Sequence, residues 1–236
     1  EKQGFELDKD ILGQIVREVP DIFFITYSNN PTGKLISKEL MKEIADTCSK
    51  LGTILVIDEC FIELTRKVNQ YSFISELYAY KNVVILRAFT KSFAIPGVRL
   101  GYLICPEGDF VEQINLFVSE WNVSILAQRA GITAMQTQNN YLKEACKLIE
   151  QEREYLSVEL KKLEMKVYES YANYILFFYD KSSKDIHKDL YELLIRQHIL
   201  IRDCRDYQGL KSGYYRIAVK CHEENIALIK ALKKVL

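Results

Sequence analysis

Four short apolar segments, with one amphipathic segment between the first two, make up much of the first hundred residues. We expect strands at residues 21–28, 53–57, 83–87 and 100–105. Between the first two, Ser37 is the expected N-cap of a helix and Gly52 its expected end, with apolar residues at helical spacing between them. Strands that are apolar along their whole length and alternate with helices are typical of a parallel sheet covered on both faces.

Polar residues follow three of these expected strands. Asn30, Asp58 and Lys91 lie just past the ends of the first, second and third strands. In open α/β sheets, ligands bind at the carboxyl ends of the strands. We therefore expect these three side chains to converge in space, although they are far apart in the sequence.

The remainder of the chain predicts a second domain. Helical periodicity is strongest at 109–118 and in a long segment at 139–163, which would bridge to that domain. Strands and helices are then expected at 174–179 (strand), 184–196 (helix), 199–201 (strand edge), 215–219 (strand) and 222–235 (helix). We expect a large domain over 1–138 and a small α+β domain over 139–236.

The charge balance and the cysteines narrow the functional classes. Lys+Arg and Asp+Glu both number 32, which argues against a nucleic-acid partner or an anionic membrane surface. No apolar run approaches the roughly 20 residues that span a bilayer. The six cysteines are scattered without a C-x-x-C pair, so they predict reduced thiols in a cytoplasmic protein and no metal site.

Three motifs carry the chemistry. Residues 87–99 read Arg-Ala-Phe-Thr-Lys-Ser-Phe-Ala-Ile-Pro-Gly-Val-Arg, and Asn-Pro-Thr-Gly (30–33) and Asp-Glu (58–59) precede them. A lysine can bond covalently to an aldehyde, a carboxylate can face a pyridinium nitrogen, and an arginine can bind a phosphate. This set is what an enzyme needs to hold pyridoxal 5'-phosphate.

In order and over essentially the whole chain, these motifs resemble the class I/II aminotransferase family of fold-type-I pyridoxal-phosphate enzymes. The resemblance implies an α/β fold: an aspartate-aminotransferase-like three-layer large domain, here N-terminally incomplete, plus a small α+β C-terminal domain. It also implies a homodimer. Two branches fit best, histidinol-phosphate aminotransferase and L-threonine-O-3-phosphate decarboxylase. Segments 58–63, 90–97, 120–124 and 201–210 resemble the decarboxylase more.

The resemblance assigns roles in coenzyme binding. Lys91 would be the catalytic lysine, bonding the coenzyme and then moving a proton at the substrate Cα. Asp58 would pair with the pyridine nitrogen, and Asn30 with the ring 3′-oxygen. Arg99 would bind the phosphate, and Thr90 would add a hydroxyl. Alternatively, the Thr90 hydroxyl bonds only to the backbone.

The resemblance also assigns substrate-binding residues. Arg216 matches the arginine that binds the α-carboxylate, and Arg202 the arginine that binds a side-chain phosphate; Asn122 would contact the substrate as well. Trp121 is as well explained by packing. Because an unpaired buried charge is costly, Arg216 needs an anionic partner, and a structural salt bridge is the alternative to substrate. For Arg202 the alternative is an ordinary surface arginine.

The chain departs from the family pattern in three places. Phe61 replaces a tyrosine that bonds the 3′-oxygen, and Ala88 replaces a serine of the phosphate site. The family's first third, with a glycine-rich phosphate-binding turn, has no counterpart before Asn30, so we expect a fragment or a truncated relative. Its four sheet strands would be contiguous with uncovered edges.

The sequence thus predicts a pyridoxal-phosphate enzyme acting on a phosphorylated amino acid or amine. Decarboxylation of L-threonine phosphate in cobalamin biosynthesis is favoured, with a histidinol-phosphate-type aminotransferase as the alternative. A non-catalytic truncated domain is the alternative from another class. A nucleotide-binding domain is disfavoured because the chain has neither a G-x-G-x-x-G motif nor a P-loop.

Overall fold

The computed structural model describes residues 4–106, 108–179 and 189–236. The chain divides into two compact units by its internal contacts. The first unit comprises residues 1–4, 30–34 and 145–236, and the second comprises residues 5–29 and 35–144. A short piece of chain around Asn30 therefore belongs by its contacts to the unit that is mostly C-terminal.

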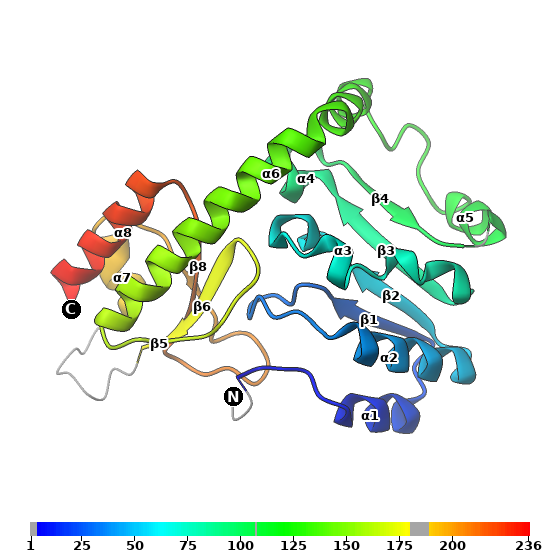
Figure 1. Ribbon diagram of the computed structural model, residues 1–236, viewed down its shortest axis with the longest axis horizontal. Helices are drawn as coiled ribbons and strands as arrows, with labels where there is room; N and C mark the ends of the chain where they lie inside the picture. Colours follow the sequence, from blue (N-terminus) through cyan, green and yellow to red (C-terminus); the bar gives the residue numbers. More distant parts are fainter. Residues whose placement is uncertain (1–3, 107, 180–188) are drawn as a thin grey trace. The chain divides into compact units, whose positions relative to one another are not determined.

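The second unit contains a four-stranded sheet (Figure 1). Its strands are β1 (Ile22–Thr26), β2 (Ile54–Asp58), β3 (Val83–Ala88) and β4 (Gly101–Ile104), in the order β1-β2-β3-β4. β1, β2 and β3 are parallel, as expected, but β4 runs antiparallel to β3. The four strands are contiguous, and the sheet is mixed rather than purely parallel.

The short connection between β3 and β4 explains the antiparallel strand. It holds the four-residue helix α4 (Phe89–Ser92) and the 3-10 turn η4 (Pro96–Val98). A parallel crossover must return along a six-residue strand of about 20 Å. The four residues of α4 advance only about 6 Å, and η4 adds only a tight turn, so no helix in this connection is long enough to span the strand; the chain turns back at the end of β3, where Ala88 pairs with Gly101.

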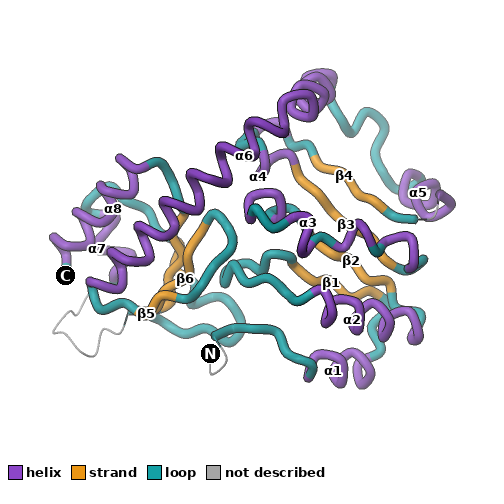
Figure 2. The backbone as a smooth tube through the Cα atoms, in the orientation of Figure 1, coloured by secondary structure: helices purple, strands orange, loops and turns teal. Residues whose placement is uncertain are grey.

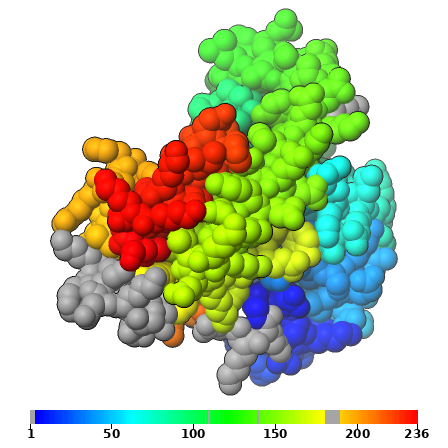
Figure 3. Space-filling model, turned by 60° about the vertical axis from the view of Figure 1, so that its left-hand side comes forward, coloured from blue at the N-terminus to red at the C-terminus, as the bar shows by residue number. Residues whose placement is uncertain are grey.

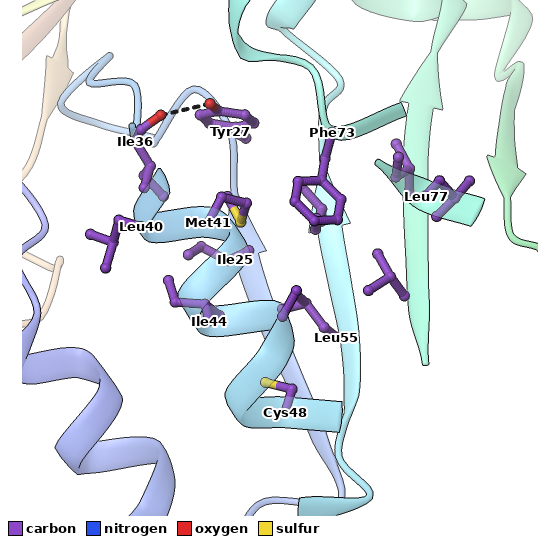
Figure 4. Packing of buried hydrophobic residues seen from close by; sticks show 14 of the residues in the cluster. Ile25, Tyr27, Ile36, Leu40, Met41, Ile44, Cys48, Leu55, Phe73 and Leu77 are labelled. Atoms are coloured by element: carbon purple, nitrogen blue, oxygen red, sulfur yellow. Dashed lines mark hydrogen bonds between the residues drawn. The ribbon is translucent and has the colours of Figure 1, made fainter. Parts of the chain in front are cut away.

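Helices α1 (Asp10–Glu18) and α2 (Lys38–Leu51) pack on this sheet (Figures 1 and 4). The expected boundaries of α2 are confirmed: the Ser37 hydroxyl accepts the Leu40 N–H at 3.2 Å, and Gly52 ends the helix with φ of 73°. The core contains the apolar side of α2 and the inward residues of β1, β2 and β3. Tyr27 is buried within it and donates its hydroxyl to the carbonyl of Ile36 at 2.6 Å.

The other face of the sheet is less covered than expected. Ile22 and Phe24 alternate along β1 and are 49% and 65% exposed in the described part of the chain. Alternate residues of a strand share one face. The expectation of a sheet covered on both faces is therefore wrong at β1.

The link from β2 to β3 consists of short turns. It contains η1 (Ile62–Thr65), α3 (Val68–Tyr71), η2 (Phe73–Ser75) and η3 (Leu77–Ala79). The short helix expected at 72–80 is thus two 3-10 turns. After β4, α5 (Gly108–Asn115) confirms the first helical segment, and the segment expected at 139–163 is the later part of one 38-residue helix, α6 (Ile125–Lys162).

The first unit packs the later part of α6 and two further helices around a second sheet (Figure 2). The strands β5 (Lys166–Val167), β6 (Tyr174–Phe178), β7 (Arg202–Asp203) and β8 (Tyr214–Ala218) are antiparallel, in the order β5-β6-β8-β7. β5 was not expected, and β7 follows the expected strand edge at 199–201. α7 (Leu190–Ile195) lies within the helix expected at 184–196, of which residues 184–188 lie outside the described residues.

The C-terminal helix α8 (His222–Val235) lies along the later part of α6 (Figure 3). Leu156 and Leu160 of α6 share a buried cluster with Leu228 and Leu232 of α8. Apolar residues at helical spacing on both helices thus close this core over the sheet.

The described residues contain neither a membrane-spanning helix nor a cluster of metal ligands. No helix there is both long and apolar enough to span a bilayer. No group of three or more His, Cys, Asp or Glu side chains there is arranged to hold a metal ion.

Candidate active site

Lys91 lies at the carboxyl end of β3, on the single helical turn α4. The turn is anchored by Phe89, whose ring centroid lies 5.5 Å from that of Phe93 and 5.6 Å from that of Tyr102. Lys91 itself is exposed, and its Nζ lies 5.5 Å from the centroid of the Phe61 ring. Packed aromatic rings thus hold this turn in place, and the Lys91 amine is exposed to solvent at the end of a buried strand.

Asp58 is the last residue of β2, beside Leu86 of β3. It is partly buried, and its Oδ1 accepts the backbone N–H of Cys60 at 2.9 Å. Burial, and next a hydrogen bond to Asp58, raise the pKa of the Cys60 thiol to about 12, while the charge of Lys91 opposes this rise. Asp58 and Lys91 thus lie at the carboxyl ends of the neighbouring strands β2 and β3.

Thr90 and Arg99 flank this region of the second unit. Thr90 precedes Lys91 on α4 and is partly buried. Arg99 is exposed, has a φ of 57°, and donates from Nη1 to the carbonyl of Pro96 at 3.2 Å. A phosphate-binding role for both residues stays a prediction.

A buried ionic network lies directly behind Asp58. Glu59 is 0% exposed and accepts from the Ser72 hydroxyl (2.9 Å), the Phe73 N–H (2.7 Å) and Arg87 Nε (2.9 Å). Arg87 is 7% exposed and also donates from Nη1 to Glu63 at 3.1 Å. No function was predicted for this network from the sequence, although Glu59 and Arg87 are charged residues at the carboxyl ends of two apolar strands.

Asn30 lies in the first unit, where its Oδ1 accepts hydrogen bonds from Arg216 Nη1 and, at 3.3 Å, from the Tyr207 hydroxyl. Two donors on the oxygen orient the amide so that its Nδ2 is the donor end. Tyr207 was not singled out in the sequence, because nothing local in the chain marks a contact across 177 residues.

Arg216 is a partly buried residue of β8. Its guanidinium carbon lies 5.2 Å from the centroid of the Tyr174 ring. No carboxylate among the described residues forms an ion pair with it. The structural salt bridge considered as its alternative role is therefore not found there, and the Asn30 amide and the Tyr174 ring are neutral partners.

Arg202 lies on β7 and is the direct cross-strand partner of Arg216. Opposed residues of an antiparallel pair project from the same face, where like charges destabilise each other. Arg202 is exposed, pairs with Asp206, and lies over the Tyr207 ring at 5.6 Å. This face of the small sheet thus carries two adjacent guanidinium groups, which suits an anion.

Asn122 and Trp121 lie in the segment between α5 and α6. Both are exposed, Trp121 at 94%, so its side chain does not pack within the described chain. The structure gives Asn122 no contact with the groups above, and its role stays a prediction.

The donor set fits pyridoxal phosphate. Lys91 presents an exposed amine just past the end of β3, and Asp58, at the end of the adjacent strand β2, is a carboxylate held by a backbone N–H. These are the groups that an aldehyde and a ring nitrogen require. The Asn30 amide belongs to the other unit, and its role toward a phenolic oxygen stays a prediction. Phe61 has no hydroxyl to offer to that oxygen.

Residues 1–232 match the family model for aminotransferase class I and II. The chain belongs to this family. Members depend on pyridoxal 5'-phosphate, which confirms the expected family, fold and coenzyme class.

Individual relatives carry two different names. The chain is 34% identical over 236 residues to threonine-phosphate decarboxylase of Salmonella typhimurium, which covers 100% of this chain and 63% of that protein. It is also 34% identical to histidinol-phosphate aminotransferase 1 of Carboxydothermus hydrogenoformans, with the same coverage. The crystal structure of histidinol-phosphate aminotransferase from Clostridium acetobutylicum matches with a TM-score of 0.89 and 30% identity, over 98% of this chain and 68% of that one. The chain thus spans about 63% of the length of these curated relatives.

Proposed function

We propose that this chain is the catalytic part of a pyridoxal-phosphate enzyme that decarboxylates L-threonine phosphate, a step of cobalamin biosynthesis. The observation that carries the coenzyme assignment is that the exposed Lys91 amine and the Asp58 carboxylate lie at the carboxyl ends of the adjacent parallel strands β3 and β2. We infer a homodimer in the cytoplasm from the family resemblance and the cysteine pattern.

Each residue has one task at the coenzyme. Lys91 would bond to the aldehyde of the coenzyme and would hold the proton that moves at the substrate Cα. Asp58 would keep the ring nitrogen protonated, because an ionised carboxylate stabilises the cation next to it. Arg99 and Thr90 would bind the phosphate, and Asn30 would donate to the ring oxygen. The coenzyme, when bound, supplies an electron sink for the charge left at Cα.

The arginine pair supports a substrate with two anionic groups. Arg216 has neutral partners and binds the α-carboxylate; Arg202, which exchanges Asp206 for the ligand, binds the side-chain phosphate. A planar guanidinium binds either oxyanion through two parallel N–H bonds. Asn122 adds a contact to the substrate.

The bond that breaks at Cα would depend on how the substrate-binding residues orient the substrate. Loss of CO2 gives a decarboxylase, and loss of a proton gives an aminotransferase. The Asp-Glu-Cys-Phe-Ile-Glu segment with Phe61 supports the decarboxylase. The alternative is a histidinol-phosphate-type aminotransferase, which the structural likeness to the clostridial enzyme supports.

A spectroscopic experiment tests the coenzyme proposal. Pyridoxal phosphate is added to the purified wild type, Lys91→Ala and Lys50→Ala, the last a control at another exposed lysine. We expect a yellow band that borohydride fixes to the protein in the wild type and in Lys50→Ala, and no fixed band in Lys91→Ala. Absence of the band from the wild type would support the non-catalytic alternative.

Product analysis then separates the two reactions. L-threonine phosphate is supplied alone, and histidinol phosphate is supplied with 2-oxoglutarate. Release of CO2 from the first supports the decarboxylase, whereas transfer of the amino group from the second without CO2 release supports the aminotransferase. Arg202→Gln should raise KM for the phosphorylated substrate more than for its unphosphorylated analogue.

A further inference from the structure

The buried network of Glu59 and Arg87 connects the two strand ends that carry the coenzyme residues. Glu59 directly follows Asp58, and Arg87 lies four residues before Lys91. The Glu59 N–H donates to the carbonyl of Leu86 at 2.9 Å, which continues the pairing of β2 and β3 past Asp58. Their side chains then close an ion pair of 2.6 Å on the buried side of this junction.

The geometry of the network is over-determined. Three donors converge on the Glu59 carboxylate, from the Ser72 hydroxyl, the Phe73 backbone and the Arg87 guanidinium. The same guanidinium also donates to the Ser72 hydroxyl at 3.0 Å and to Glu63 at 3.1 Å. A planar fork with five N–H donors can satisfy these directions at once, whereas a lysine offers one ammonium.

Such a network is a poor device for stability alone. Removing two charges from water is costly, and well-packed apolar residues often serve a core equally well. We expect it to contribute geometric specificity, because a fully satisfied buried polar network favours one arrangement of the residues that it joins. Here those residues are the chain segments immediately next to Asp58 and immediately before α4.

We propose that Arg87 and Glu59 are positioning residues for the coenzyme reaction, which fix the spacing between the Asp58 carboxylate and the Lys91 amine. The proposal rests on the proposed coenzyme function and adds to it two residues that touch neither coenzyme nor substrate. A change in the Glu59–Arg87 contact would displace the end of β2 relative to the start of α4. It would thereby alter the spacing between the Asp58 carboxylate, which would hold the ring nitrogen, and the Lys91 amine, which would bond the aldehyde.

The test uses the full chain and three variants. Arg87→Lys retains the charge but loses the planar fork, and Glu59→Gln retains the shape but loses the charge. Leu55→Ala is the matched control, because Leu55 is fully buried on β2. Its replacement by alanine destabilises the same core without touching the network. Each protein is studied equally far below its own melting temperature, so that stability alone does not separate them.

Two readouts report geometry. One is the rate at which added pyridoxal phosphate bonds to Lys91, measured by borohydride quenching and mass spectrometry of the Lys91 peptide. The other is the visible circular dichroism per bound coenzyme, which depends on how the ring is held. We expect Arg87→Lys and Glu59→Gln to slow bonding on the order of tenfold or more, since a displacement of about 1 Å can cost a hundredfold in rate. Both should also lose dichroism, while Leu55→Ala keeps the wild-type values.

Wild-type bonding rate and dichroism in both network variants would overturn the proposal, as would equal losses in Leu55→Ala. If Arg87→Lys does not fold, Glu59→Gln decides by the same criteria. Failure of the wild type itself to bond the coenzyme would refute the proposed function, and the positioning role with it. The two failures are therefore distinguished by which protein shows them.

Discussion

Gly33 is the position where one added methyl group should disturb the chain most. It has a φ of +71°, and a β-carbon there would lie 1.9 Å from Ser170 Oγ and 2.8 Å from Ser170 Cβ. Ser170 is buried, donates its hydroxyl to the carbonyl of Tyr174 at 2.6 Å and accepts the Ala172 N–H at 3.1 Å. The serine side chain cannot move aside without losing these two hydrogen bonds.

The cost of Gly33→Ala has two parts. A left-handed backbone costs an L-residue about 1–2 kcal/mol, and a buried group that loses its hydrogen-bond partner costs about 1–3 kcal/mol. We therefore expect Gly33→Ala to lower the free energy of unfolding by about 2–5 kcal/mol. Gly52→Ala is the matched control, because Gly52 has a φ of +73° with no atom within 4 Å of the added carbon, so it should cost only about 1–2 kcal/mol.

Urea unfolding followed by far-UV circular dichroism measures both variants. The double variant Gly33→Ala with Ser170→Gly removes the clashing atoms and leaves only the Ser170 Cα position, 3.3 Å away. It should lose less stability than the sum of its two single substitutions. A Gly33→Ala protein no less stable than Gly52→Ala would refute this account of the 30–34 segment.

Three further predictions concern the second unit. Leu55→Ala should lower the free energy of unfolding by about 2–5 kcal/mol in urea titration, because it leaves a cavity in a closed core. Burial raises the pKa of Cys60 to about 12, so a thiol reagent at pH 8 should label it far more slowly in the native than in the unfolded protein. Because folding raises the pKa of Cys60, the buried thiol contributes to the free energy of unfolding, and this contribution is fully present below the pKa of the unfolded thiol. It is lost as the pH rises from that value through about 12. Hydrogen bonds from Lys42 and Lys38 lower the pKa of Glu76 to about 2. The resulting stability is present above the unfolded pKa and is lost as pH falls through about 2, and Glu76→Gln should remove this acid dependence from the melting temperature.

Local signals in the sequence predicted the elements that depend on local chemistry. The Ser37 cap, the Gly52 end and Asp58 at the end of β2 were all found where side-chain type and spacing indicated them. The direction of β4 was not, because its apolar composition fits a parallel and an antiparallel strand equally well. The connection before it, which holds no helix longer than the four residues of α4, was the better guide.

Contacts between residues that are far apart in the chain could not be predicted from the sequence. Arg216 was predicted to need an anionic partner, but its bond to Asn30 joins residues 186 positions apart. Glu59 and Arg87 have charged side chains, which usually lie at the surface, and only the folded sheet shows that they satisfy each other inside the protein. Sequence patterns thus predicted the local caps and strand ends better than they predicted the long-range partners of these side chains.

The division of the chain has a consequence for making fragments of it. The chain passes from one unit to the other four times, after residues 4, 29, 34 and 144. A single cut therefore cannot separate the two units. A protein beginning at Ala145 would lack the 30–34 segment, and with it the Gly33 carbonyl that accepts the Tyr171 N–H and the Asn30 amide that accepts from Arg216. A synthetic peptide carrying residues 30–34, fused by a linker to such a fragment, would be needed to complete it.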